Sequence, residues 1–265
     1  MTVTGLLLTN LALLLLCALV LWAYSLGRRD VTIIDSYWPL GMVLAALASD
    51  FLTGGGTPHR WALTALTALW GLRLGIHLFR RWRHHGADRR YRALLDGAMA
   101  KRGWGFAKAS LLLVFLLQPP LQFIVCLPVQ LGQLDPQPAA LGLVGWAGVA
   151  LALLGILFES IADGQLARFR RQAAPDAVLD TGLWRYTRHP NYFGDACVWW
   201  GLYLIAAETP YGVWSLPGPL LLTWTLMRWS GVPMLERGLK ARRPAYEDYV
   251  RRTSGFVPWP PLGES

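Results

Sequence analysis

The sequence predicts an all-α, polytopic membrane protein with seven transmembrane helices, the N-terminus outside and the C-terminus in the cytoplasm. Two observations support this prediction. Of the 265 residues, 54% are hydrophobic and only 15% are charged, whereas a soluble domain has about 25% charged residues. The lysines and arginines also concentrate in alternate connecting segments, as the short cytoplasmic loops of membrane proteins do. We expect one integral-membrane domain over residues 1–265.

Each expected span is an apolar segment of about 20 residues, the length that crosses the hydrocarbon core of a bilayer. The first is the plainest, because "GLLLTNLALLLLCALVLWAYSLG" has no charged residue and is followed by Arg28 and Arg29. A signal peptide would have a positive charge before its apolar run and a small-residue cleavage site after it, so we expect a retained helix. The seven spans are 5–26, 33–52, 61–79, 109–131, 141–163, 190–208 and 213–232.

The charged residues between these spans set the orientation. Nearly all of the 25 lysines and arginines fall in four segments expected inside, which are 27–32, 80–108, 164–189 and 233–265, and only Arg60 lies in a loop expected outside. This asymmetry places the basic segments in the cytoplasm. It also explains the net charge of +9 by contact with anionic membrane lipids, so nucleic acid is not expected as a partner. The outer loops are short and expected to be poor in chemistry.

Several common kinds of site have no counterpart in the sequence. Gly54-Gly55-Gly56 lacks the Lys-Ser/Thr that completes a phosphate loop, and no G-x-G-x-x-G fingerprint follows a strand. The three cysteines fall within the expected spans and show no metal-ligand spacing. We therefore expect no metal site, and a nucleotide would have to be bound in another way.

The first polar stretch on the expected inner side is "FESIADGQLARFRRQ". Glu159 and Asp163 are one helical turn apart and share a helix face. Glu159 lies inside the fifth span, where a carboxylate usually faces the bundle or a cavity. Arg170 and Arg171 follow, and their guanidinium groups suit phosphate oxygens. The same arginines are equally expected as positive anchors at a helix end.

The second stretch, "GLWRYTRHPNYFGD", leads directly into the sixth span. Pro190 suits the first turn of a helix, so the preceding loop should deliver its side chains to the mouth of that span. Asn191 and Asp195 then lie one turn apart on one face. Polar groups at membrane depth need partners, which a bound polar ligand or neighbouring helices can supply. The polar side chains gathered here are Tyr186, Arg188, His189, Asn191, Tyr192 and Asp195.

The third stretch is the C-terminal tail, "LERGLKARRPAYEDYVRRTSGFVPWPP", with two short amphipathic segments. Glu236 can belong to a surface ion pair, and Tyr246 and Tyr249 can be anchors at the membrane interface. Alternatively, the tail folds back and closes a site under the helix bundle.

These three stretches resemble the steroid 5-alpha-reductase family, in particular its bacterial branch of small multi-span proteins. The wider superfamily includes sterol C14 reductases and isoprenylcysteine carboxyl methyltransferases. The resemblance covers mainly residues 61–261 and is strongest from 155 onward. It implies a seven-helix protein of a bacterial inner membrane, with NADPH bound by the half at about 141–265 and reached from the cytoplasm. The implied reaction is reduction of a carbon–carbon double bond in a lipid-soluble enone such as a 3-oxo-4-ene steroid.

The resemblance assigns the three stretches to the cofactor. Asp163 and Arg170 match positions that hold the dinucleotide, and Asn191 matches a cofactor asparagine at the start of a helix. Asp195 replaces a family glutamate, and Glu159 stands where the family has an asparagine. The residues implied to bind NADPH are Glu159, Asp163, Arg170, Arg171, Tyr186, Arg188, His189, Asn191, Tyr192, Asp195, Glu236, Tyr246 and Tyr249.

An enone also needs a proton donor near its carbonyl oxygen, where negative charge develops. The resemblance places Asp35 near a catalytic glutamate of the family and Leu78 opposite its tyrosine, and leucine cannot donate a proton. We therefore assign Asp35 and Tyr37 as catalytic residues, with Tyr91 and His77 as alternatives to Tyr37. Asp35 could instead simply begin a helix near the interface.

Two other functions compete with the reductase. One is methyl transfer from S-adenosylmethionine to a lipid-soluble acceptor, although a cofactor without phosphate has less need of arginines. The other is a non-enzymatic lipid-binding or transport protein, which would need polar groups on both sides of the membrane. The sequence shows such groups only on the expected inner side. In each case the partners are a lipid-soluble small molecule and membrane lipids, and the sequence does not indicate an oligomeric state.

Overall fold

The computed structural model describes all residues except 135–139, 175, 230, 241–242 and 263–265. It confirms the all-α prediction, because 78% of the chain is helical and the described residues include no strand. The chain divides into two compact units, each built from two stretches of sequence. Unit 1 comprises Met1–Trp146 and Leu202–Gly218, and unit 2 comprises Ala147–Gly201 and Pro219–Ser265. The single domain over 1–265 stays a prediction.

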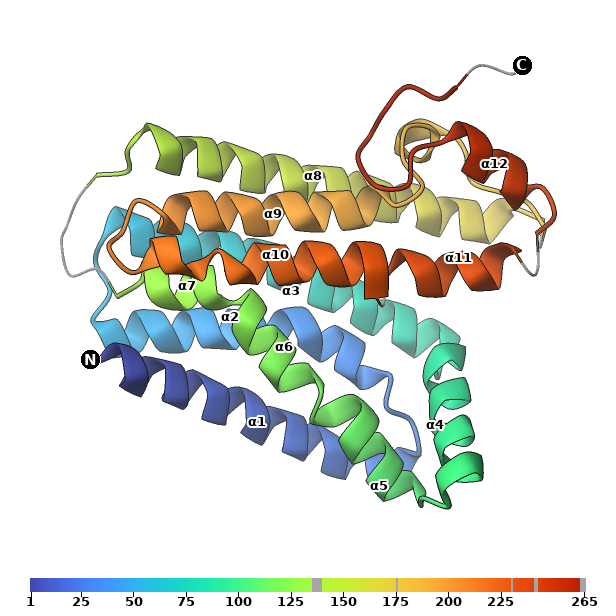
Figure 1. The fold of residues 1–265 in the computed structure, drawn as a ribbon, viewed down its shortest axis with the longest axis horizontal. Helices are drawn as coiled ribbons and strands as arrows, with labels where there is room; N and C mark the ends of the chain where they lie inside the picture. The colour runs from blue at the N-terminus through green and yellow to red at the C-terminus, as the bar shows by residue number, and fades with distance from the viewer. Residues whose placement is uncertain (135–139, 175, 230, 241–242, 263–265) are drawn as a thin grey trace. The chain divides into compact units, whose positions relative to one another are not determined.

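Unit 1 begins with three long helices that pack in sequence order (Figure 1). The second and third approach closely because two glycines one turn apart face the second helix. A Cβ atom on Gly71 would lie 2.8 Å from the carbonyl oxygen of Pro39, and one on Gly75 would lie 2.8 Å from the side chain of Leu40. These helices are α1 (Val3–Arg28), α2 (Ile33–Thr53) and α3 (Pro58–His85).

The remainder of unit 1 is a series of shorter helices. The span expected at 109–131 is helical but broken, because a π-helical turn and three prolines, at 119, 120 and 128, interrupt it. A polar helix precedes it, and Asp88 caps that helix by accepting a hydrogen bond from the backbone of Arg90 at 2.8 Å. The elements are α4 (Arg89–Arg102), α5 (Phe106–Ser110), η1 (Leu111–Phe115), α6 (Gln118–Val125), α7 (Leu127–Gly132) and η3 (Gly212–Ser215).

Unit 2 contains most of α8 (Leu143–Gln172) and α9 (Pro190–Ala206), which lie side by side (Figure 1). Their backbones touch through glycine: a Cβ on Gly194 would lie 2.7 Å from both the carbonyl oxygen of Gly155 and the amide nitrogen of Glu159. As expected, α9 begins at Pro190. The other elements of this unit are η2 (Gly182–Arg185), the greater part of α10 (Pro217–Trp224), η4 (Thr225–Trp229), α11 (Val232–Lys240) and α12 (Tyr246–Arg252).

Within the residues that the structure describes, four helical segments are long and apolar enough to cross a membrane, and they indicate a membrane protein. They are Val3–Arg28, Pro58–His85, Phe106–Val125 and Leu143–Gln172. The other three expected spans fall on helices that are shorter, interrupted or more polar. Helix α9 has 17 residues, α10 changes to a π-helical turn after 8 residues, and α2 includes Asp35 and Asp50. The count of seven spans and the orientation of the termini stay predictions.

Candidate functional site

Among the described residues, each unit contains a cluster built around a carboxylate, which lies beside two arginines in unit 1 and beside an arginine and a histidine in unit 2. In unit 1 we call it the Asp35 cluster, and it comprises Asp35, Arg81, Arg90 and Tyr91. In unit 2 we call it the tail cluster, and it comprises Arg188, His189, Glu236 and Tyr249.

The Asp35 cluster is assembled from three helices. Asp35 lies in the first turn of α2, and its side chain is 17% exposed. Tyr91, from α4, donates its hydroxyl to Asp35 Oδ1 at 2.6 Å. The guanidinium groups of Arg81, from α3, and Arg90, from α4, lie 3.3 and 3.5 Å from Asp35 Oδ2. The result is a partly buried carboxylate with a phenol on one oxygen and two cations on the other.

A second carboxylate holds the Asp35 cluster in position. Asp88 caps α4 and also pairs with Arg90, with 2.8 Å between Oδ2 and Nη2, while its own amide donates to Thr32 Oγ1 at 2.9 Å. Burial alone would raise the pKa of Asp88, but hydrogen bonds and charge from Arg90 lower it below its usual range. Burial and the charge of Asp35 raise the pKa of Tyr91 well above its usual value. Tyr91 is therefore protonated at neutral pH and available as a donor.

The structure separates the two tyrosines considered for proton donation. Tyr37 is 7% exposed, and its hydroxyl donates to the carbonyl oxygen of Leu14 in α1 at 3.3 Å. Its ring belongs to an apolar cluster that includes Ile34 and Phe115. Tyr91 is the tyrosine that the structure brings to Asp35. The sequence reasoning gave Tyr91 only as an alternative and missed Arg81 and Arg90, because they become neighbours of Asp35 only when α2, α3 and α4 pack.

The tail cluster is buried and highly connected. Glu236 Oε1 lies 2.8 Å from Arg188 Nε and 3.1 Å from His189 Nε2. Arg188 also donates through Nη1 to the carbonyl oxygens of Val250, at 3.2 Å, and Thr253. Burial alone would raise the pKa of Glu236, but the hydrogen bonds and charges of His189 and Arg188 lower it to about 2. Glu236 is therefore ionised at neutral pH.

The tail folds back onto the loop that precedes α9, as in the second of the two arrangements considered for it. That the tail also closes a site stays a prediction. The amide of Arg188 donates to the carbonyl oxygen of Ser254, and the amide of Trp259 to that of Tyr186, both at 2.9 Å. Tyr249 donates to the carbonyl oxygen of Trp184. Tyr246 and Tyr249 are 3% and 2% exposed, so both rings are packed inside the protein. Burial raises the pKa of both hydroxyls.

The first turn of α9 contacts α8 through polar side chains. Asn191 Nδ2 donates to Asp163 Oδ1 at 3.4 Å, while Asn191 Oδ1 accepts from the amide of Tyr192 at 3.1 Å. The ring of Tyr192 stacks on that of His189, with centroids 5.5 Å apart and planes 7° from parallel. Asp163, Glu159 and Asp195 are all buried, at 7%, 3% and 8% exposure. The structure thus brings the amide and carboxylates of two sequence stretches to one place in unit 2.

The remaining cofactor candidates lie at the surface of unit 2. Arg170 and Arg171 are exposed in the last turn of α8, and Tyr186 is 43% exposed. The donor set fits a dinucleotide in part: exposed guanidinium groups suit phosphate, and the Asn191–Asp163 pair offers an amide and a carboxylate. Arg188 and His189 fit less directly, because their hydrogen bonds go to Glu236 and to backbone carbonyls.

Two residues at the expected outer side form an ion pair that the sequence did not indicate. The expectation that the outer loops are poor in chemistry stays a prediction. His59 Nε2 lies 2.9 Å from Glu208 Oε2, and Glu208 also accepts from the amides of Gly142, at 3.0 Å, and Gly145, at 2.7 Å. Glu208 thereby satisfies amides at the start of α8. His59 and Glu208 are 149 residues apart, so no local pattern could have paired them.

A further polar network lies inside unit 1. Asn10 Nδ2 donates to Ser49 Oγ at 2.8 Å and to Gln130 Oε1 at 3.2 Å. All three side chains are fully buried and come from α1, α2 and α7. Interhelical hydrogen bonds of this kind hold membrane helices together, and they show that polar groups in unit 1 are not limited to the expected inner end.

Comparison with known proteins identifies one family. Residues 21–253 match the family described as "Protein of unknown function (DUF1295)", which lies in the steroid 5-alpha-reductase-like superfamily in general. An uncharacterized protein of Schizosaccharomyces pombe is 21% identical over 271 residues, with 90% of this chain and 76% of the relative covered. No solved structure matches the chain.

Proposed function

We propose, because the chain belongs to the DUF1295 family, that it is a membrane-embedded, NADPH-dependent reductase of a carbon–carbon double bond in a lipid-soluble enone. The observation that best supports this is the Asn191–Asp163 hydrogen bond, which joins two resemblance-carrying stretches within unit 2. When bound, NADPH supplies a hydride, and the protein's task is to position the cofactor and polarise the acceptor.

In this proposal the residues of unit 2 have two different tasks. Asn191, Asp163 and the exposed Arg170 and Arg171 would bind the dinucleotide, with the arginines on its phosphates. The tail cluster would act indirectly, since Glu236 holds Arg188 and His189 and thereby fixes the loop that leads into α9.

The Asp35 cluster of unit 1 supplies the candidate proton donor. The hydroxyl of Tyr91 already donates to Asp35, so Asp35 orients it. Arg81 and Arg90 balance the charge on Asp35 and would stabilise negative charge that develops when the phenol gives up its proton. This assignment replaces Tyr37 with Tyr91 in the proposed catalytic pair.

The proposal includes seven spans in a bacterial inner membrane, with the N-terminus outside and the cofactor residues facing the cytoplasm. Reporter fusions after residues 55, 135 and 210 should read as external, and those after 90, 175 and 260 as internal. An internal reading after residue 135 would require a different arrangement of spans.

One observation favours a second candidate, a non-enzymatic lipid-binding or transport protein. That function needs polar groups along a helix bundle and at both of its ends. Besides the Asp35 cluster, unit 1 has two further polar groupings, which are the Asn10–Ser49–Gln130 network and the His59–Glu208 pair. A binding protein of this kind would not bind NADPH, so cofactor binding separates the two candidates.

The reductase proposal is tested by nucleotide binding to purified variants. Arg170→Ala with Arg171→Ala should weaken the binding of NADPH far more than that of NADH. The expected loss of binding free energy is roughly 1.5–3 kcal/mol for each lost charged contact. Asn191→Ala should weaken both nucleotides while the melting temperature stays near that of the wild type. Arg83→Ala with Arg89→Ala is the matched control, because both side chains are exposed and lie in unit 1. Equal losses for NADPH and NADH would make Arg170 and Arg171 membrane anchors only.

A further inference from the structure

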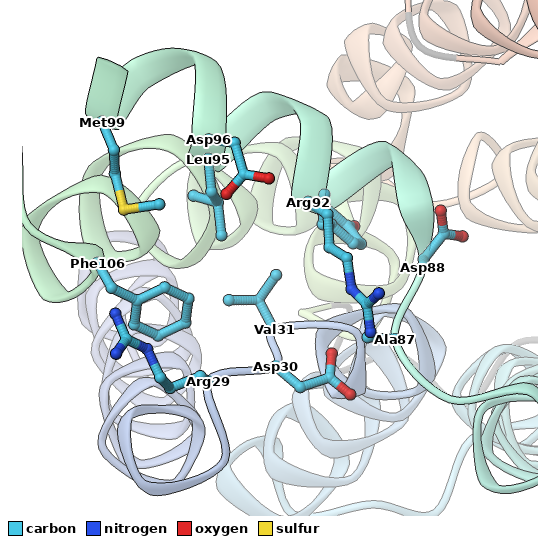
Figure 2. A pocket seen from close by; sticks show the side chains of 11 residues that line it. Arg29, Asp30, Val31, Ala87, Asp88, Arg92, Leu95, Asp96, Met99 and Phe106 are labelled. Carbon is cyan, nitrogen blue, oxygen red and sulfur yellow. The ribbon is translucent and has the colours of Figure 1, made fainter.

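A cavity of about 240 Å³ opens in unit 1 between the end of α1, the start of α5 and one face of α4. Figure 2 shows its labelled side chains gathered around Val31. Val31 and Leu95 are 2% and 4% exposed, and with Met99 and Phe106 they make an apolar floor. Charged side chains line the remainder, so the cavity is amphipathic.

Two arginines in the cavity wall have unused donors. Arg29, at the C-terminal cap of α1, lies over the ring of Phe106 with 5.6 Å between its Cζ and the ring centroid. Arg92 projects from α4 on the other side of Val31 (Figure 2). Within the described part of the chain neither guanidinium group has a hydrogen bond or ion pair. Guanidinium groups bind phosphate oxygens through several donors at once.

Two of the acids beside these arginines are already occupied. Asp30 accepts from Thr32 and from Trp82 Nε1, the latter at 2.8 Å, and Asp88 is paired with Arg90 at 2.8 Å. Burial alone would raise the pKa of Asp30, but these hydrogen bonds and, to a smaller extent, the charge of Arg92 lower it. Asp96 is exposed and makes no hydrogen bond within the described residues, so its negative charge should oppose an anion in the cavity. Asp96 is therefore a useful probe of the ligand's charge.

The residues beside the cavity are of the types found at the depth of the lipid headgroups in a membrane. The Trp104 ring, two residues before Phe106, lies 4.7 Å from Arg102 Cζ and 5.1 Å from Lys108 Nζ. Tryptophan with adjacent basic residues is typical of the membrane interface. The cavity also lies at the end of α1, a candidate membrane span.

We propose that this cavity binds the phosphate ester headgroup of an anionic membrane lipid, with the phosphate held by Arg29 and Arg92 and the adjoining glycerol carbons on the apolar floor. The cavity wall includes Tyr91, the candidate proton donor, but none of the residues assigned to the cofactor. Lipid binding by Arg29 and Arg92 does not depend on the reductase proposal.

The test measures calorimetric binding of dihexanoyl phosphatidic acid to the full-length protein in a neutral detergent. Dihexanoyl phosphatidylcholine and inorganic phosphate are the comparison ligands. Arg29→Gln with Arg92→Gln should lower the affinity for phosphatidic acid at least about tenfold, as expected for lost hydrogen bonds to a charged group. Arg83→Gln with Arg89→Gln removes the same charge from exposed sites outside the cavity and should change the affinity less than about twofold. Asp96→Asn removes a negative charge and no hydrogen-bond donor, so it should raise the affinity for phosphatidic acid.

Two results would overturn the proposal. Equal weakening by the two double variants would mean that phosphatidic acid responds only to net surface charge. Inorganic phosphate could also bind as tightly as phosphatidic acid and lose this binding in Arg29→Gln with Arg92→Gln. That result would make the cavity a site for free phosphate. The Asp96→Asn measurement does not require the arginine variants to fold. A lower affinity of Asp96→Asn for phosphatidic acid would also contradict binding of an anion.

Discussion

The Asp35 cluster and the tail cluster both combine a carboxylate, an arginine and a tyrosine, but the tyrosine donates its hydrogen bond to a different kind of group in each. In the tail cluster Tyr249 donates to a backbone carbonyl and Arg188 bonds to Glu236 and two further carbonyls, so its donors are used to hold the tail. In the Asp35 cluster the phenol of Tyr91 donates to the carboxylate itself, and Tyr91 also lines a cavity. The difference teaches that a dense polar motif in the sequence can serve to hold the fold together, while sparse polar residues can assemble a carboxylate and a phenol beside a cavity.

The largest effect should come from breaking the tail cluster. Glu236→Gln removes a carboxylate whose side chain is 13% exposed and leaves the Arg188 side chain, which is 12% exposed, without its negatively charged partner. Breaking a buried ion pair in this way should lower the free energy of unfolding by about 3 kcal/mol, measured by denaturant or thermal unfolding in detergent. Glu247→Gln, on the exposed face of α12, is the control and should change little. A similar stability for both variants would mean that the tail is held by its apolar contacts.

The same pair predicts a pH dependence. The pKa of Glu236 is lowered to about 2 in the folded protein, below its unfolded value of about 4.3. Because the folded pKa is depressed, the stabilisation is fully present above about pH 5 and is lost as the pH falls towards 2. The stability difference between wild type and Glu236→Gln, measured from pH 7 downward, should therefore shrink across this window. A difference that stays constant to pH 3 would contradict the assignment.

A smaller effect should separate the two tyrosines of unit 1. Tyr91→Phe removes a hydrogen bond to a charged group, which contributes about 1.5–3 kcal/mol, whereas Tyr37→Phe removes a bond to a carbonyl worth about 1 kcal/mol. Unfolding measurements should therefore show the greater loss for Tyr91→Phe. The reverse order would mean that the bond from Tyr37 to Leu14 contributes more to stability than the bond from Tyr91 to Asp35.

The smallest effect is expected for an exposed ion pair in α12. Arg251 and Asp248 are 75% and 64% exposed, and such pairs contribute about 0–1 kcal/mol. Arg251→Gln should leave the melting temperature nearly unchanged, although it removes one charge from the helix that carries Tyr249. A loss comparable to that of Glu236→Gln would show that charge anywhere in the tail, rather than the buried pair, stabilises unit 2.

Local signals predicted the helices well and the contacts less well. Pro190 marked the start of α9, because proline fits the first turn of a helix, and the apolar segments marked helical regions. The fold-back of the tail was left open, since Tyr249 finds its carbonyl partner 65 residues earlier. Arg81, Arg90 and Glu208 were missed for a similar reason. Their partners are 46 to 149 residues away, and such contacts depend on helix packing that no local spacing reports.

The central claim is that unit 2 binds a phosphorylated dinucleotide, and one titration tests it most directly. Purified full-length protein is titrated in parallel with NADPH, NADH and S-adenosylmethionine by calorimetry. We expect saturable binding of NADPH, weaker binding of NADH because it lacks the phosphate that arginines recognise, and no binding of S-adenosylmethionine. Binding of S-adenosylmethionine without NADPH would assign the protein to methyl transfer. Binding of neither would contradict the reductase and leave a lipid-binding or transport protein.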